Sequence, residues 1–359
     1  MTESRGAAPG RGFWRAVDER VGISSLTYHV PDHAQGLGYS LGAITLASFI
    51  VLVVTGIWLG QFYNPMPDEA RSSLRYILAS APAGFFVRNL HYWAANAMLL
   101  TALLHMLRVL YSGAYKRPRE ANWLVGIGLL ALTVGLVFTG SVLKWDQEGL
   151  EGLAHNVEIA GLLGGLGAWF APSFSDTIPI LTRLYIAHVS ILPILLAALF
   201  VIHALLIKYH GLAPDALSGR DATTRRTAGE PSRGTFLGHL GVAGLYSLIG
   251  LGLLVFLAVT VPAQLGPAPV EGIEITKPWW MFLPIFAIEN AIGLGGLLWA
   301  SLAIFVALAI VPLLDRSPHL HPSRRRAILI AYGLFALAIV GLGVYAKIAP
   351  SAAHLGMGG

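Results

Sequence analysis

The amino-acid sequence predicts an all-α, polytopic membrane protein with seven transmembrane helices. Of its 359 residues, 55% are hydrophobic and only 12% are charged, and the mean hydropathy is +0.66. A soluble domain usually carries about 25% charged residues. Seven apolar stretches are long enough to cross a bilayer as helices, which takes about 20 residues. These stretches are residues 37–60, 89–111, 122–143, 184–207, 237–261, 290–313 and 326–347.

The polar segments between these spans predict the domain organisation. Residues 1–36 form an N-terminal segment with a short amphipathic helix at 13–21, suited to a membrane surface. A stretch at 212–236 is rich in Gly, Pro and Arg, which is typical of a linker. It separates a four-helix module at 37–211 from a three-helix C-terminal module at 237–359.

The distribution of Lys and Arg predicts the orientation. With the N-terminus in the cytoplasm, sixteen of these residues lie on the cytoplasmic side and seven on the other, in line with the positive-inside rule. We therefore expect a multi-pass protein of a bacterial inner membrane with its C-terminus in the periplasm. This asymmetry explains the net charge of +5, so no nucleic-acid partner is implied. The lack of cysteine excludes disulfides and thiolate metal sites.

Two of the spans each carry a pair of histidines. His91 and His105 are 14 residues apart, and His188 and His203 are 15 apart. Each pair projects from roughly one helix face, with about 21–22 Å between its members along the axis. Both helices run from outside to inside in the predicted orientation, so the two pairs match in depth. Such helices could hold two haems, each iron between one histidine of each helix, with no open site for dioxygen. This arrangement passes electrons.

Glycines repeat with the same spacing as the histidines. Gly42 and Gly56 are 14 residues apart, and so are Gly126 and Gly140. Because glycine weakens a helix, the repeat favours close approach of something flat, such as a haem edge, over ordinary small-residue packing. A lone histidine on an apolar helix is more often a hydrogen-bonded core residue than a ligand. A transporter or proton channel is another alternative for intramembrane histidines, but it explains neither the glycine repeat nor the matched depths.

Two arginines flank the first histidine pair. Arg88 precedes His91 by three residues, and Arg108 follows His105 by three. Each would lie one turn beyond a haem, where it could pair with a propionate carboxylate. The alternative is that these side chains reach to the membrane interface.

At these residues the chain resembles cytochrome b, the quinone-reacting core subunit of cytochrome bc and bf complexes. The resemblance covers most of residues 13–345 and is strongest in 40–65, 87–120 and 182–211. The segment KWDQEG (144–149) is similar to the PWDQ-type segment of that family. The spacings of 14 and 15 resemble the bf-type branch, with its separate second subunit fused on as the last three spans.

The resemblance implies cofactors and partners. It implies two non-covalent haems b, an outer one held by His91 and His188 and an inner one held by His105 and His203. The glycines would make room for the macrocycles, and Arg88 would contact a propionate, as would Arg108. A quinone of the menaquinone or ubiquinone type and a homodimer are also implied.

Three departures from the family pattern affect the expected chemistry. Ser40 stands where the bf-type branch has a cysteine that anchors an extra haem, so no covalent haem c is expected. Lys144 replaces the proline of the PWDQ-type segment. In KPWWMFLPIF (277–286) Trp279 stands where the PEWY-type motif has a glutamate that takes a proton from quinol. Quinol oxidation needs a base, and tryptophan cannot serve as one.

Acidic residues elsewhere could replace this base. Asp146, Glu148 and Glu289 are the nearest candidates in sequence. Glu148 is better explained by solvation at the membrane interface. Asp146 and Glu289 are therefore the candidate proton acceptors.

Two electron-transfer functions remain open. In the first, the chain is the cytochrome b of a quinol:cytochrome c oxidoreductase that works with a Rieske iron–sulfur protein and a cytochrome c. In the second, it is a two-haem conduit between a periplasmic redox partner, such as a multihaem subunit, and an inner quinone site. The first is favoured because most of the outer-site scaffold is retained. Candidate contacts at the inner quinone site are His33, Ser40, Lys208 and His210.

Overall fold

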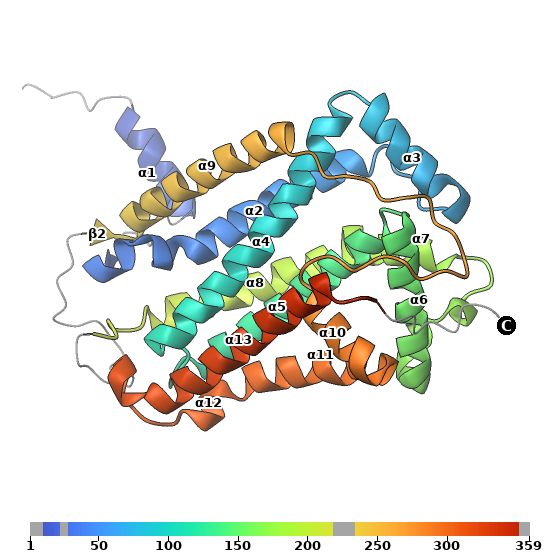
Figure 1. Ribbon diagram of the computed structural model, residues 1–359. Coiled ribbons are helices and arrows are strands. Elements are labelled where there is room, and N and C mark those ends of the chain that lie inside the picture. The colour runs from blue at the N-terminus through green and yellow to red at the C-terminus, as the bar shows by residue number, and fades with distance from the viewer. Residues whose placement is uncertain (1–9, 22–27, 218–233, 352–359) are drawn as a thin grey trace, which may run out of the picture.

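The structure is a computed structural model that describes residues 10–21, 28–217 and 234–351. Its spans are all helical, as predicted (Figure 1). Six helices are long and apolar enough to cross a membrane, and two shorter apolar helices occupy the place of the seventh. The six are α2 (Leu37–Leu59), α4 (Gly84–Ser112), α5 (Glu120–Val142), the continuous run α7 (Ile180–Ile186), η5 (Ala187–Ile191) and α8 (Leu192–His210), α9 (Phe236–Thr260) and α13 (Arg326–Ile348).

The predicted span at 290–313 differs from the structure. It is divided into α10 (Leu283–Ile292) and α11 (Leu294–Ala309), followed by the short α12 (Val311–Leu314). The break falls at Gly293, whose φ of +81° suits glycine and ends an α-helix. The start was predicted too late because Pro284 suggested a loop, whereas proline is well tolerated in the first turn of a helix.

The spans pack as pairs around the centre of the molecule (Figure 1). α2 packs on α4, α5 packs on α8, and α9 covers the outside of the α2–α4 pair through residues such as Leu254 and Ala258. α10, α11 and α13 pack together, and α11 is joined to α5 by the Trp123 Nε1–H, which donates to the Leu308 carbonyl at 2.8 Å. The division at 212–236 remains a prediction, because residues 218–233 lie outside the described part of the chain.

Shorter elements cover the two ends of the bundle. One end carries α3, α6 and two 3₁₀ turns, and the connection from α9 to α10 crosses it (Figure 1). At the other end, a pair of two-residue antiparallel strands joins the segment before α2 to the start of α9. The elements of both ends are α3 (Pro67–Ala79), α6 (Gln147–Leu162), η3 (Gly164–Phe170), η4 (Pro172–Phe174), η2 (Asp32–Gln35), β1 (His29–Val30), β2 (Gly234–Thr235), η6 (Pro322–Arg324) and the N-terminal helix α1 (Gly10–Val21).

A buried ionic cluster holds the second of these ends together. The Asp315 carboxylate accepts hydrogen bonds from Lys116 Nζ at 2.6 Å, from Arg325 Nε at 2.8 Å and from the Tyr115 hydroxyl at 2.5 Å. Burial opposes the ionisation of Asp315, but these hydrogen bonds outweigh it and lower its pKa to about 2. The cluster therefore ties the loop after α12 to the loop after α4.

Candidate functional site

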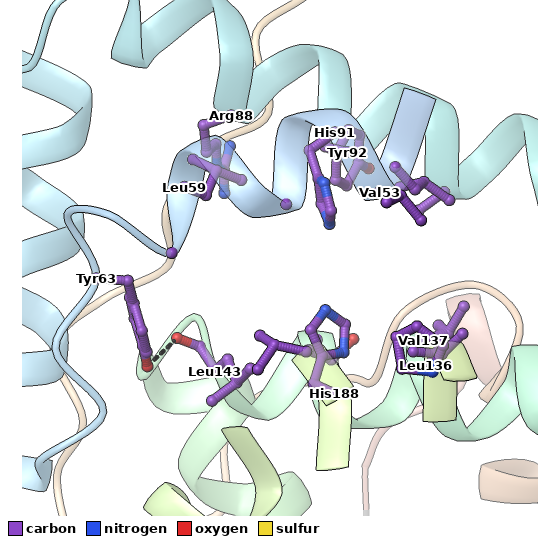
Figure 2. A pocket seen from close by; sticks show the side chains of 18 of the residues that line it. Val53, Leu59, Tyr63, Arg88, His91, Tyr92, Leu136, Val137, Leu143 and His188 are labelled. Atoms are coloured by element: carbon purple, nitrogen blue, oxygen red, sulfur yellow. Dashed lines mark hydrogen bonds between the residues drawn. The ribbon is translucent and has the colours of Figure 1, made fainter. Parts of the chain in front are cut away.

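His91 and His188 face each other across the space between α4 and η5 (Figure 2). Their ring centres are 6.4 Å apart. When one metal ion joins two imidazoles, metal–nitrogen bonds of about 2.0–2.1 Å place the ring centres roughly 6.3 Å apart. The two side chains are therefore spaced as the two axial ligands of one iron.

A threonine fixes the orientation of each of these imidazoles. The Thr55 hydroxyl donates to the Val51 carbonyl at 2.6 Å and lies 2.8 Å from Nδ1 of His91. A hydroxyl has one hydrogen, so Thr55 must accept from Nδ1–H. Thr139 does the same for His188, at 2.9 Å, while it donates to the Gly135 carbonyl. In both rings the lone pair is thus left on Nε2, the tautomer that a metal requires.

A cavity of about 460 Å³ surrounds this histidine pair. Its lining combines apolar side chains of α2, α4 and α5 with Arg88, Tyr63, Lys144 and Trp279. Figure 2 shows the two imidazoles pointing into it from opposite walls. An apolar cavity with two facing imidazole lone pairs and a few charged side chains at its edge fits a haem with bis-histidine ligation.

The four repeated glycines each lie against one of the four histidines. A Cβ added at Gly140 would meet Cε1 of His188 at 3.0 Å, and one at Gly56 would meet Cε1 of His91 at 3.4 Å. The corresponding distances are 3.3 Å from Gly42 to His105 and 3.7 Å from Gly126 to His203. The glycines therefore make room first for the imidazole rings, which then lie between their helix pairs.

His105 and His203 form the second pair, nearer the other end of the bundle. They come from α4 and α8, as His91 and His188 come from α4 and η5. Nδ1 of each is buried without a hydrogen-bond partner, although the Asn122 carbonyl lies near His203. Leu41 and Val125 precede the two glycines here, where the first pair has threonines.

The unequal spacings of the two pairs are reconciled by a π-turn. Each residue of an α-helix turns by about 100°, so 14 residues end about 40° short of whole turns, and 15 end about 60° beyond them. Residues Ala187–Ile191 form a π-turn, in which the Leu192 N–H donates to the Ala187 carbonyl. Such a turn takes up one additional residue. His188 and His203 therefore have the same angular offset as His91 and His105.

The flanking arginines are placed differently at the two pairs. Arg88 lines the first cavity, and its Nη1 donates to the Ala263 carbonyl and, at 3.4 Å, to Asn89 Oδ1. Arg108 stacks on the ring of Tyr39 in α2, 3.4 Å from the ring centre. Neither assignment to a propionate is tested by these contacts.

The connection between α9 and α10, residues 261–282, is fastened to α6 near the first pair. The Gln147 side chain accepts from the Val270 N–H at 2.7 Å and donates to the Ile273 carbonyl at 3.1 Å. The Glu151 carboxylate accepts from the N–H of Ile275 at 2.8 Å and from the N–H of Thr276 at 3.0 Å. These contacts fix the connection and so place Trp279 in the cavity lining.

The predicted proton acceptors have distinct surroundings. Asp146 caps α6: one oxygen accepts from the Gly149 N–H at 3.0 Å and the other from the Gly266 N–H at 2.9 Å. Glu148 pairs with Lys144 at 2.6 Å on a partly exposed surface. Glu289 is 1% exposed and lies 3.0 Å from Nε2 of His155. Asp146 and Glu148 are thus occupied structurally, and Glu289 is buried beside an ionisable partner.

The candidate quinone contacts are spread over the second end. Ser40 is fully buried and directs its hydroxyl to the Gly36 carbonyl at 3.5 Å. The ring of His33 packs edge-on against Tyr39, while Lys208 is exposed at the end of α8. The His210 carbonyl accepts from Arg119 at 3.4 Å. These contacts place the residues without testing a quinone role.

Sequence reasoning missed Thr55, Thr139 and His155. The two threonines each immediately precede a repeated glycine, so the dipeptide Thr-Gly recurs at 55–56 and 139–140. That repeat was a usable signal. His155 carried none, because only the fold brings α6 against Glu274 and Glu289.

Comparison with known proteins gives consistent matches along the chain. The family described as cytochrome b (N-terminal)/b6/petB matches residues 96–272, and the family cytochrome b (C-terminal)/b6/petD matches residues 268–358. Cytochrome b6 of Heliobacterium mobile is 40% identical over 188 residues, which is 51% of this chain and 88% of the relative. A cytochrome bc complex cytochrome b subunit of Chlorobaculum thiosulfatiphilum is 28% identical over 338 residues, covering 88% of this chain and 74% of the relative. A chain of a hyperthermophilic respiratory Complex III has the same fold, with a TM-score of 0.80, 23% identity and coverage of 94% of this chain and 92% of that chain.

Proposed function

Because this chain belongs to the cytochrome b family of bc- and b6f-type complexes, we propose that it carries two haems b and moves electrons between them across the membrane. Members of this family bind haem b and transfer electrons with quinone in a membrane. The finer assignment places one haem at His91 and His188 and the other at His105 and His203. A haem supplies a one-electron redox centre whose potential the protein adjusts.

The observation that carries this assignment is the facing pair His91 and His188. Their 6.4 Å separation and their threonine-fixed tautomers suit two axial ligands of one iron. The second pair repeats the arrangement with glycines at the same positions. Together they supply two one-electron sites at different depths of one helix bundle.

We propose that the electrons come from quinol of the menaquinone or ubiquinone type, oxidised at the His91/His188 end. This end faces the periplasm of a bacterial inner membrane in the orientation that the basic residues favour. The partners would then be a Rieske iron–sulfur protein and a cytochrome c, in a homodimeric complex. Support comes from the connection 261–282, which Gln147 and Glu151 hold in a defined course beside the cavity.

The second candidate function is a two-haem conduit without quinol oxidation at this end. Trp279 favours it, because an indole lining the cavity cannot take a proton. In that case a periplasmic redox subunit would exchange electrons with the first haem. The inner quinone site would lie by the second haem.

Purification of the complex from its native membrane separates these functions. We expect two b-type haems per chain in the reduced-minus-oxidised spectrum, a copurifying Rieske protein, and quinol:cytochrome c turnover that is blocked by inhibitors directed at the His91/His188 end. A stable multihaem partner without such turnover would support the conduit. Absence of any b-type spectrum would contradict both.

A further inference from the structure

Three ionisable side chains meet between α6, the 261–282 connection and α10. Nε2 of His155 lies 3.0 Å from Oε1 of Glu289 and 3.5 Å from Oε1 of Glu274. The three side chains are 14%, 1% and 4% exposed, respectively. Nδ1 of His155 lies 2.7 Å from the Glu151 carbonyl, which can only accept. His155 therefore donates through Nδ1 and presents Nε2 to both carboxylates.

This geometry favours one shared proton beyond that of the imidazolium. A neutral Nε2 would direct its lone pair at two carboxylate oxygens, so the contacts require a proton on Nε2 or on a carboxyl group. Burial lowers the pKa of His155, but the hydrogen bond and charge of Glu289, the Glu151 carbonyl and the charge of Glu274 outweigh it and raise the pKa. Two carboxylates that converge on one site also favour binding of one proton between them. The trio can thus take up and release a proton while its carboxyl groups stay buried.

The surroundings of the trio leave it as the site able to receive a proton. The Glu151 carboxylate is occupied by N–H groups of the connection, and Lys277 donates to the carbonyls of Lys347 and Ala349 instead of the trio. Asp146 accepts from two backbone N–H groups. Among the described residues, no group of three His, Cys, Asp or Glu side chains is arranged to hold a metal ion. The trio is therefore built for protons.

The same connection joins the trio to the cavity. Glu274 precedes Trp279 by five residues in the segment that α6 holds in place. Trp279 lines the cavity, and its buried Nε1–H has no hydrogen-bond partner. That N–H can donate to a quinol oxygen and orient it, but the proton must go elsewhere.

We propose that His155, Glu274 and Glu289 form a buried proton-binding site that accepts a proton from quinol at the His91/His188 end. This inference rests on the proposed quinol oxidation. The O–H bond of one quinol hydroxyl breaks, and its proton binds to a carboxylate oxygen of the trio. The two electrons go to a high-potential iron–sulfur acceptor and to the haem, and the proton later leaves to water.

The first test reads the proton itself in the purified complex. Infrared difference spectra recorded across a pH titration should contain a carboxylic-acid C=O band in the native chain. Glu289→Gln or Glu274→Gln should remove this band. The control Glu158→Gln, an exposed acid on the same helix, should keep it. An identical band in both trio variants would overturn the proposal.

The second test reads the use of the proton. Glu289→Gln should lower quinol:cytochrome c turnover by at least about 100-fold, since a positioned acid–base group contributes 10²–10⁴-fold, and it should flatten the pH profile while both haem spectra stay unchanged. Glu289→Asp should restore part of the turnover, and Glu158→Gln should match the native chain. Native turnover and pH profile in Glu289→Gln and Glu274→Gln would overturn the proposal, even where His155→Asn fails to assemble.

The two tests distinguish failure of this inference from failure of the proposed function. A native complex that shows the infrared band but no quinol turnover would refute quinol oxidation at this end, and with it the donor assigned to the trio. Turnover with no band in the native chain would refute the trio and leave quinol oxidation standing.

Discussion

The two histidine pairs have the same frame but different surroundings. At His91 and His188, threonines accept from both Nδ1 atoms. At His105 and His203, Leu41 and Val125 occupy the equivalent positions, and both Nδ1 atoms lack a hydrogen-bond partner. A hydrogen bond from Nδ1–H makes an imidazole a more basic ligand, which stabilises oxidised iron. The comparison therefore predicts a lower reduction potential at His91/His188, so that electrons run toward His105/His203.

The largest expected effect comes from removing a ligand. His188→Leu should lose the haem at its own pair and keep the other, which halves the haem extracted per chain and stops electron transfer between the ends. His239→Leu removes a buried histidine of α9 that lies outside both pairs and should keep both haems. Full haem content in His188→Leu would refute the assignment.

A graded effect is expected from alanine at the four glycines. Gly140→Ala brings a Cβ to 3.0 Å from the facing ring, and Gly126→Ala brings one only to 3.7 Å. Overpacking typically destabilises by about 1–3 kcal/mol, so Gly140→Ala should weaken haem retention on the order of tenfold to a hundredfold. Gly126→Ala should have the smallest effect of the four. Haem retention during dilution in detergent measures the order, and a reversed order would show that these contacts do not limit binding.

A smaller effect is expected at the threonines. Thr55→Val or Thr139→Val removes one hydrogen bond worth about 0.5–1.5 kcal/mol, which for one electron corresponds to roughly 20–60 mV. The haem at His91/His188 should titrate at a higher potential in each variant, while the other haem stays unchanged. Thr133→Val is the matched control, since Thr133 donates only to the Leu129 carbonyl. A shift in the control of the same size would attribute the effect to the cavity instead.

The smallest effect is a difference in pH dependence between the two ends. Because the pKa of Asp315 is lowered to about 2, its stabilisation is present above its unfolded pKa of about 3.9 and is lost as the pH falls toward 2. The pKa of His155 is raised, so its stabilisation is complete below about 6.5 and is lost as the pH rises through its folded value. Hydrogen exchange should therefore increase in 311–325 on acidification and in 261–282 on alkalisation. Equal changes at both ends would contradict this assignment.

The spans were predictable because the membrane demands them. A bilayer core requires about 20 apolar residues per helix, and the observed α2 and α13 match the predicted ranges within a residue or so. The break at Gly293 was not predictable, because glycine is common within transmembrane helices and only the backbone conformation shows which glycine ends one.

The frame of the site was also predictable, but its electrostatics were not. Histidines and glycines at matched spacing indicated two pairs, since helical periodicity converts spacing into a common face. The contact of His155 with Glu289 joins residues 134 positions apart, and no local pattern encodes such a distance. Asp146 was a candidate base by sequence alone, and only the backbone of 261–282 revealed it as a cap.

The π-turn at Ala187–Ile191 has a consequence for how such chains are compared. A helix with this turn could lose one residue there and return to plain α-geometry with both ligands still on one face. Spacings of 14 and 15 are then interchangeable answers to one geometrical requirement. The number of residues between two ligands measures kinship only when the type of helix between them is counted as well.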